Sequence, residues 1–156
     1  MKNLFRAQAL VLLTGTIFAW YTVYQDFSRF YLNEGTVFKI NDCIVPNPVT
    51  TPCFYGAFAF LAAFIWSLYI IKFVDEKQKL HQQKLFWLLI ASVLFAWGNF
   101  SRTLYSFWLS KGAPTIGCSG VLSTSPWSTP CFIGSVIFLL AMIMALVIKF
   151  RAKKNI

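Results

Sequence analysis

The feature that most constrains the fold is a four-residue motif that occurs twice. Thr-Pro-Cys-Phe occupies residues 51–54 and again 129–132, and a long apolar run follows each copy. A second motif, Phe-Ala-Trp, occupies residues 18–20 and again 95–97, so each half of the chain carries both motifs at nearly the same spacing. Self-similarity at a fixed period indicates duplication of one structural unit. We therefore predict two tandem repeats, residues 1–78 and 79–156.

Composition indicates a membrane protein. The chain is 58% hydrophobic and only 12% charged, whereas soluble domains carry about 25% charged residues. Each half contains two uncharged runs close to the ~20 residues that a membrane-spanning helix needs. Backbone groups in lipid must be hydrogen-bonded within their own segment, so each run should be a helix. We predict an all-α integral membrane protein of two parallel helical hairpins, with transmembrane helices over about 7–25, 54–73, 85–108 and 131–149.

The distribution of basic residues predicts the orientation. Most of the 14 lysines and arginines flank the start of the first helix, the polar segment 72–84 and the end of the fourth helix. By the positive-inside rule, both termini and the middle segment are cytoplasmic, and the cysteine-containing segments lie outside, here in a bacterial plasma membrane. The net charge of +9 therefore does not indicate nucleic acid. The expected partners are the lipid bilayer and either a membrane protein or further copies of this chain.

All four cysteines fall in the segments predicted to lie outside. Disulfides persist in oxidising compartments, and four cysteines allow three pairings. The repeat favours one bridge within each half, Cys43–Cys53 and Cys118–Cys131, each holding an outer loop against the start of a helix.

Two of these cysteines lie at predicted helix starts. Thr51 and Thr129 are suitable N-caps before a proline, which puts Cys53 and Cys131 in first turns, where the helix dipole favours a thiolate. The topology and the two outer cysteine pairs resemble the DsbB and vitamin K epoxide reductase families, membrane oxidoreductases that pass electrons to quinone. Those families carry Cys-x-x-Cys at a helix start, and this sequence has no such spacing. The resemblance keeps open a thiol–disulfide oxidoreductase that uses quinone.

Other candidate residues lie at the outer ends of the first and third helices. Asp26 and Arg29 are spaced to meet on one helical face, and Asn99 and Arg102 occupy the matching boundary of the third helix. Aromatic residues there are typical of an interfacial belt, or alternatively line a cavity for an apolar ligand. The aromatic candidates are Trp20, Tyr24, Trp97, Tyr105 and Trp108.

The sequence offers little catalytic or transport chemistry. The apolar runs carry no charge that would indicate an ion path, and no phosphate-binding loop, nucleophile elbow or HExxH motif occurs. The single histidine, His81, cannot form a metal site by itself. We expect a non-enzymatic polytopic membrane protein without metal or cofactor: a scaffold, an accessory subunit or an apolar-ligand binder. The oxidoreductase is the alternative, and a small oligomeric channel or transporter is a third option.

Overall fold

The structure is a computed structural model that describes residues 2–38, 46–73, 75–111, 113–117 and 119–154. Of these described residues, 83% are helical, as the prediction of an all-α fold requires. Its long helices are α1 (Lys2–Glu34), α2 (Pro52–Ile71), α3 (Asp75–Leu109) and α4 (Pro130–Lys154).

Short elements precede α2 and α4. A single 3-10 turn comes directly before each helix: η1 (Pro48–Thr50) before α2, and η2 (Pro126–Ser128) before α4. Between α3 and η2, the strands β1 (Thr115–Ile116) and β2 (Leu122–Ser123) pair antiparallel. This ribbon of two strands, each two residues long, was not predicted, because strands this short show no alternation of apolar and polar residues.

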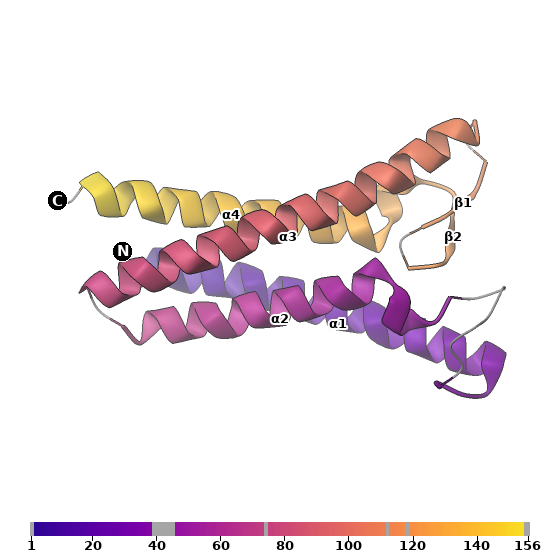
Figure 1. Cartoon of the computed structure of the whole chain (residues 1–156), viewed down its shortest axis with the longest axis horizontal. Coiled ribbons are helices and arrows are strands. Elements are labelled where there is room, and N and C mark those ends of the chain that lie inside the picture. The colour runs from indigo at the N-terminus through magenta and orange to yellow at the C-terminus, as the bar shows by residue number, and fades with distance from the viewer. Residues whose placement is uncertain (1, 39–45, 74, 112, 118, 155–156) are drawn as a thin grey trace.

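The four long helices form one elongated bundle (Figure 1). Both chain termini and the α2–α3 connection lie at one end, which we call the terminal end. The last turns of α1 and α3 and the first turns of α2 and α4 lie toward the other, which we call the cysteine end. Helix α1 packs against α2 and α4, and α3 packs against the same two helices, so α2 and α4 face each other diagonally.

All four helices are long and apolar enough to cross a membrane. Their outward surfaces are apolar too: exposed side chains along the bundle include Leu10, Ile17, Leu68, Leu94 and Leu140. Helices that are hydrophobic on every side suit a lipid environment better than water. The structure therefore agrees with a multi-pass helical bundle. The tandem repeat and the side of the membrane on which each end lies stay predictions.

Two helices extend beyond their apolar runs. Helix α1 continues to Glu34 and ends at Gly35, whose φ of +66° lies in the left-handed region that glycine adopts without strain. The Gly35 amide donates to the Tyr31 carbonyl at 2.8 Å. Helix α3 starts at Asp75 and includes the charged segment, so the predicted repeat boundary between 78 and 79 falls inside it.

Small residues allow the helices to approach closely. Ala57 and Ala63 on α2 and Ala141 and Ala145 on α4 are completely buried, as expected where helices pack in a membrane. On α1, Gly15 leaves no room for a side chain, because a Cβ there would overlap the ring of Phe60 and lie 3.0 Å from Ile137 Cγ2. Helices α1 and α3, the other diagonal pair, are joined by a hydrogen bond near the terminal end. Gln82 on α3 donates to Gln8 on α1 at 3.0 Å.

A candidate apolar pocket at the cysteine end

The starts of α2 and α4 are built alike. Thr51 Oγ1 donates to the Pro48 carbonyl at 2.7 Å, and Thr129 Oγ1 donates to the Pro126 carbonyl at 2.6 Å. Both threonines are buried. The sequence correctly placed Thr51 at the N-cap position of α2, but its hydroxyl does not accept from the helix as predicted. Instead, each hydroxyl fastens a 3-10 turn to the helix start and fixes the direction in which the chain enters the bundle.

The two helix starts bring two cysteines together. Cys53 at the start of α2 and Cys131 at the start of α4 come within 4.3 Å of each other. The sequence-based prediction paired each of them with the other cysteine of its own half and did not predict that they would meet. Cys43 and Cys118 lie outside the described residues, so the pairs Cys43–Cys53 and Cys118–Cys131 stay predictions.

The cysteines border a cavity of about 50 Å³ between the four helices. A cavity this size holds roughly three to five water molecules. Helices α2 and α4 each contribute the proline before the cysteine, the cysteine, the glycine three residues after it and the phenylalanine seven after it. These residues are Pro52, Cys53, Gly56 and Phe60 on α2, and Pro130, Cys131, Gly134 and Phe138 on α4.

Helices α1 and α3 complete the wall in the same paired manner. Each contributes the first two residues of its Phe-Ala-Trp motif and the residue four positions after the phenylalanine. The residues are Phe18, Ala19 and Thr22 on α1, and Phe95, Ala96 and Asn99 on α3. Residues at the same distance from each copy of the Thr-Pro-Cys-Phe motif, and from each copy of the Phe-Ala-Trp motif, thus line one cavity.

The wall is almost entirely apolar. Its two polar side chains bind their own helices: Thr22 Oγ1 donates to the Phe18 carbonyl at 3.0 Å, and Asn99 Nδ2 donates to the Phe95 carbonyl at 2.8 Å. Adding a Cβ at Gly56 would meet nothing within 4 Å. The cavity therefore has an apolar surface suited to a hydrocarbon group, and the polar groups of Thr22 and Asn99 at its wall are bonded to their own helices.

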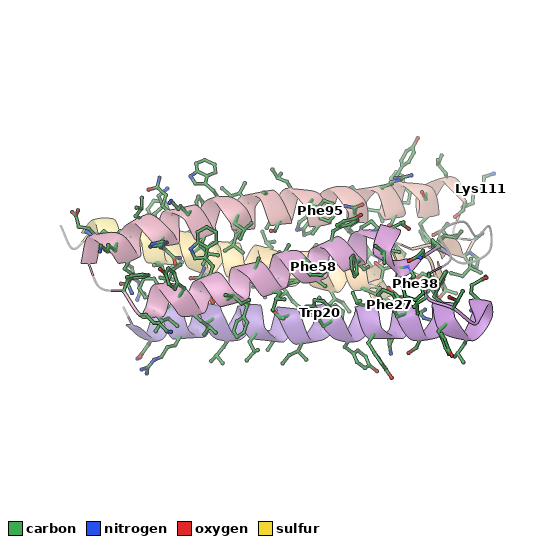
Figure 2. All side chains as sticks on the ribbon, turned by 60° about the horizontal axis from the view of Figure 1, so that its bottom comes forward. Trp20, Phe27, Phe38, Phe58, Phe95 and Lys111 are labelled. Carbon is green, nitrogen blue, oxygen red and sulfur yellow. The ribbon has the colours of Figure 1, made fainter. Side chains whose placement is uncertain are left out.

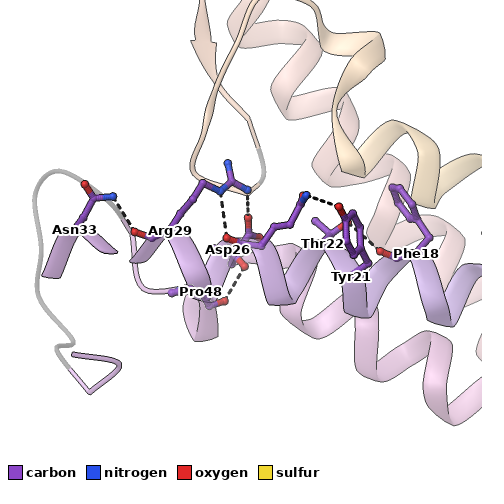
Figure 3. Close-up of polar contacts among 9 residues, drawn as sticks. Phe18, Tyr21, Thr22, Asp26, Arg29, Asn33 and Pro48 are labelled. Carbon is purple, nitrogen blue, oxygen red and sulfur yellow. Dashed lines mark hydrogen bonds and ion pairs between the residues drawn. The ribbon is translucent and has the colours of Figure 1, made fainter. Parts of the chain in front are cut away.

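A charged pair lies one turn beyond Thr22 along α1 (Figure 3). Arg29 Nη2 donates to Asp26 Oδ1 at 2.6 Å, which confirms that these two residues meet. The Asp26 side chain is 3% exposed and that of Arg29 is 41% exposed. Asp26 Oδ2 is buried and has no hydrogen-bond partner among the described residues. At the corresponding position on α3, Thr103 donates to the Asn99 carbonyl at 3.2 Å, so the second half has no matching charge there.

Loops from the two halves also touch at the cysteine end. The ring of Pro46 lies against Gly120, whose φ is +75°. A Cβ at Gly120 would overlap Pro46 Cγ and lie 2.8 Å from Pro46 Cδ. This contact joins the segment before η1 to the turn between β1 and β2.

The aromatic candidates lie around the bundle rather than in the described cavity wall. Tyr24, Tyr105 and Trp108 are exposed, as an interfacial belt requires. Trp20 packs edge-on against Phe58 of α2, with ring centroids 5.2 Å apart (Figure 2). Trp97 packs edge-on against Phe100 at 5.7 Å. Arg102 is exposed on α3.

Sequence reasoning did not select the aromatic residues that do line the cavity. Phe18 and Phe95 open the repeated Phe-Ala-Trp motif, and Phe60 and Phe138 stand at equal distances from the repeated cysteine. The signal was equivalence between the two halves, and it was available in the sequence. The predicted aromatic candidates were tryptophans and tyrosines, because these residues are typical of membrane interfaces.

The described part of the chain contains no group of three or more histidine, cysteine or acidic residues that could hold a metal ion. A scan against protein-family models finds no match, and searches of curated proteins and of solved structures find none either.

Proposed function

We propose that this chain is a multi-pass membrane protein in which two tandem hairpins form one shared pocket that binds a small apolar molecule. The observation that carries the proposal is the composition of the cavity wall: both halves contribute equivalent residues, and nearly all of them are apolar. Ligand sites in helical bundles commonly form between helices and are lined by hydrophobic and aromatic side chains.

The orientation follows from charge. We infer that the termini and the α2–α3 connection lie in the cytoplasm and that the cysteine end lies outside, in a bacterial plasma membrane. The pocket would then open near the outer surface. A reporter enzyme that folds only outside the cytoplasm, fused after Ile156, should be inactive, and activity there would reverse the orientation.

Filling the cavity tests the binding proposal. A Gly56→Phe substitution adds a ring at the cavity wall through a Cβ that meets nothing within 4 Å. It should abolish binding of a small photoreactive hydrocarbon probe to the purified protein in lipid nanodiscs. Gly98→Phe is the matched control, because a Cβ at Gly98 also meets nothing within 4 Å and Gly98 is exposed on α3, outside the cavity wall. Equal labelling of cavity residues in both variants would exclude the pocket as the binding site.

A second candidate function is thiol–disulfide exchange, which the 4.3 Å approach of Cys53 and Cys131 favours. With one predicted pair reduced and the other oxidised, the thiolate of one helix-start cysteine attacks the helix-start sulfur of the other pair. A Cys53–Cys131 bond forms and the outer cysteine of the attacked pair leaves as a thiolate, so no net oxidant is needed for this step. Electrons would enter from an external dithiol and leave to a quinone.

Disulfide mapping separates the two candidates. Under the binding proposal, non-reducing mass spectrometry should find the pairs Cys43–Cys53 and Cys118–Cys131 fully oxidised and resistant to a glutathione buffer. Ready reduction, or a Cys53–Cys131 bond at intermediate redox potential, would instead support exchange. Copurification of a stoichiometric membrane-protein partner would support a role as an accessory subunit.

A further inference from the structure

We propose that the ligand is amphipathic, with a neutral hydroxyl-bearing head that donates a hydrogen bond to Asp26 and a hydrocarbon chain of which one segment enters the cavity. This inference rests on the proposed apolar-ligand function and deepens it by naming the ligand class. It starts from the unpartnered Asp26 Oδ2, one turn from the cavity wall.

The geometry of Asp26 leaves one acceptor unsatisfied. Arg29 binds Oδ1 at 2.6 Å, and Oδ2 is buried without a partner among the described residues. A buried charged oxygen without a hydrogen bond is strongly unfavourable. A donor that arrives with a ligand would satisfy it.

The position of Asp26 suits a head group. Asp26 follows Thr22 by four residues on α1, and residues at that spacing lie on the same helical face, about 6 Å apart. Thr22 forms part of the cavity wall, and Figure 3 shows Thr22, Asp26 and Arg29 in succession along the helix. A molecule with its chain in the cavity would place its polar end beside Asp26.

The charges around the head favour a neutral donor. The Arg29 guanidinium already balances the Asp26 carboxylate, so a hydroxyl satisfies Oδ2 without adding charge. An anionic head would face the carboxylate, and a cationic head would compete with Arg29 for it. On α3, the corresponding Thr103 is neutral and bonded within its own helix, so it offers no second ionic partner.

The test compares head groups on one chain length. The full-length protein in nanodiscs is labelled with a photoreactive decanol analogue, and decanol, decanoate, decylamine and decane compete with the probe. We expect labelling of cavity residues, with decanol competing about tenfold better than decane once each is corrected for partition into the bilayer, as a hydrogen bond to a charged group implies. Decanoate and decylamine should compete less well than decanol.

Two variants isolate the acceptor. Asp26→Leu, which keeps a similar shape but has no oxygen to accept a hydrogen bond, should remove the preference for decanol over decane. Thr103→Val, at the corresponding position of α3, should keep it. If Asp26→Leu does not fold, Arg29→Gln answers the question, because an unbalanced carboxylate should shift the preference from decanol to decylamine.

The outcomes distinguish the two levels of the proposal. Labelling of the cavity with equal competition by decanol and decane would overturn the head-group inference and leave the apolar pocket standing. An unchanged decanol preference in Asp26→Leu, or in Arg29→Gln should that variant be needed, would also overturn it. Absence of cavity labelling would overturn both the inference and the proposed function.

Discussion

The rings of Phe60 and Phe138 stack face to face across the bundle, with centroids 3.6 Å apart and planes inclined by 8°. Phe60 lies on α2 and Phe138 on α4, at the same distance from the repeated cysteine in each half. Both side chains are almost completely buried, and both form part of the cavity wall. One ring pair therefore joins the diagonal helices and bounds the candidate pocket.

Truncation of either ring should destabilise the bundle. Phe→Ala costs about 3–5 kcal/mol in soluble cores, and in lipid only the packing part of that cost remains. We expect about 2 kcal/mol for Phe60→Ala or Phe138→Ala, measured by denaturant unfolding in bicelles. The double variant should lose less than the sum, by about 1 kcal/mol for an aromatic pair. Phe150→Ala is the control, because Phe150 is 67% exposed and should change stability little.

The Phe60 ring also limits what α1 tolerates. A Gly15→Ala substitution places a methyl group where Phe60 now lies and 3.0 Å from Ile137 Cγ2. We expect a destabilisation of about 1–3 kcal/mol, as for other overpacked cores, with a lower melting temperature in detergent. Gly98→Ala meets nothing within 4 Å and should be neutral or slightly stabilising, since alanine favours the helix. Equal melting temperatures for the two variants would contradict the close approach of α1.

The main outlines of the fold could be predicted from the sequence. Uncharged apolar runs predicted the four helices because lipid leaves the backbone no other hydrogen-bonded choice. The spacing of Asp26 and Arg29 predicted their ion pair. These are local signals, carried by residues close together in the chain.

The candidate site could not be predicted in the same way, because it depends on which helices become neighbours. Periodicity does not say that α2 and α4 face each other diagonally, so nothing local placed Cys53 near Cys131 or Phe60 on Phe138. Likewise, Thr51 fits the N-cap preference, but the preceding Pro48 turn offers its hydroxyl a carbonyl instead. The recurrence of equivalent residues around both copies of each motif was the only signal for these contacts, and it does not by itself say which residues meet.

The contact between loops at the cysteine end should depend on Gly120. Gly120→Ala would place a methyl group against Pro46 and force a non-glycine residue to a φ of +75°. We expect a cost of about 1–2 kcal/mol from the backbone conformation alone. The variant should show faster proteolysis of the segments at this end. Gly117→Ala is the matched control, because its Cβ would make only ordinary contacts at 3.5 Å with Thr129 and Val121.

The paired threonine hydroxyls should contribute equally to the two helix starts. Thr51→Val and Thr129→Val keep the side-chain shape but remove the donors to the Pro48 and Pro126 carbonyls. Each buried carbonyl then loses a hydrogen bond, at about 1 kcal/mol per site. We expect similar losses for the two single variants and an additive loss for the double variant, measured by thermal unfolding in nanodiscs. Thr14→Val, which removes an exposed bond to the Val11 carbonyl, should change stability less. A loss of stability for one single variant and none for the other would show that the two helix starts are not energetically equivalent. That result would count against a pocket to which both halves contribute equally.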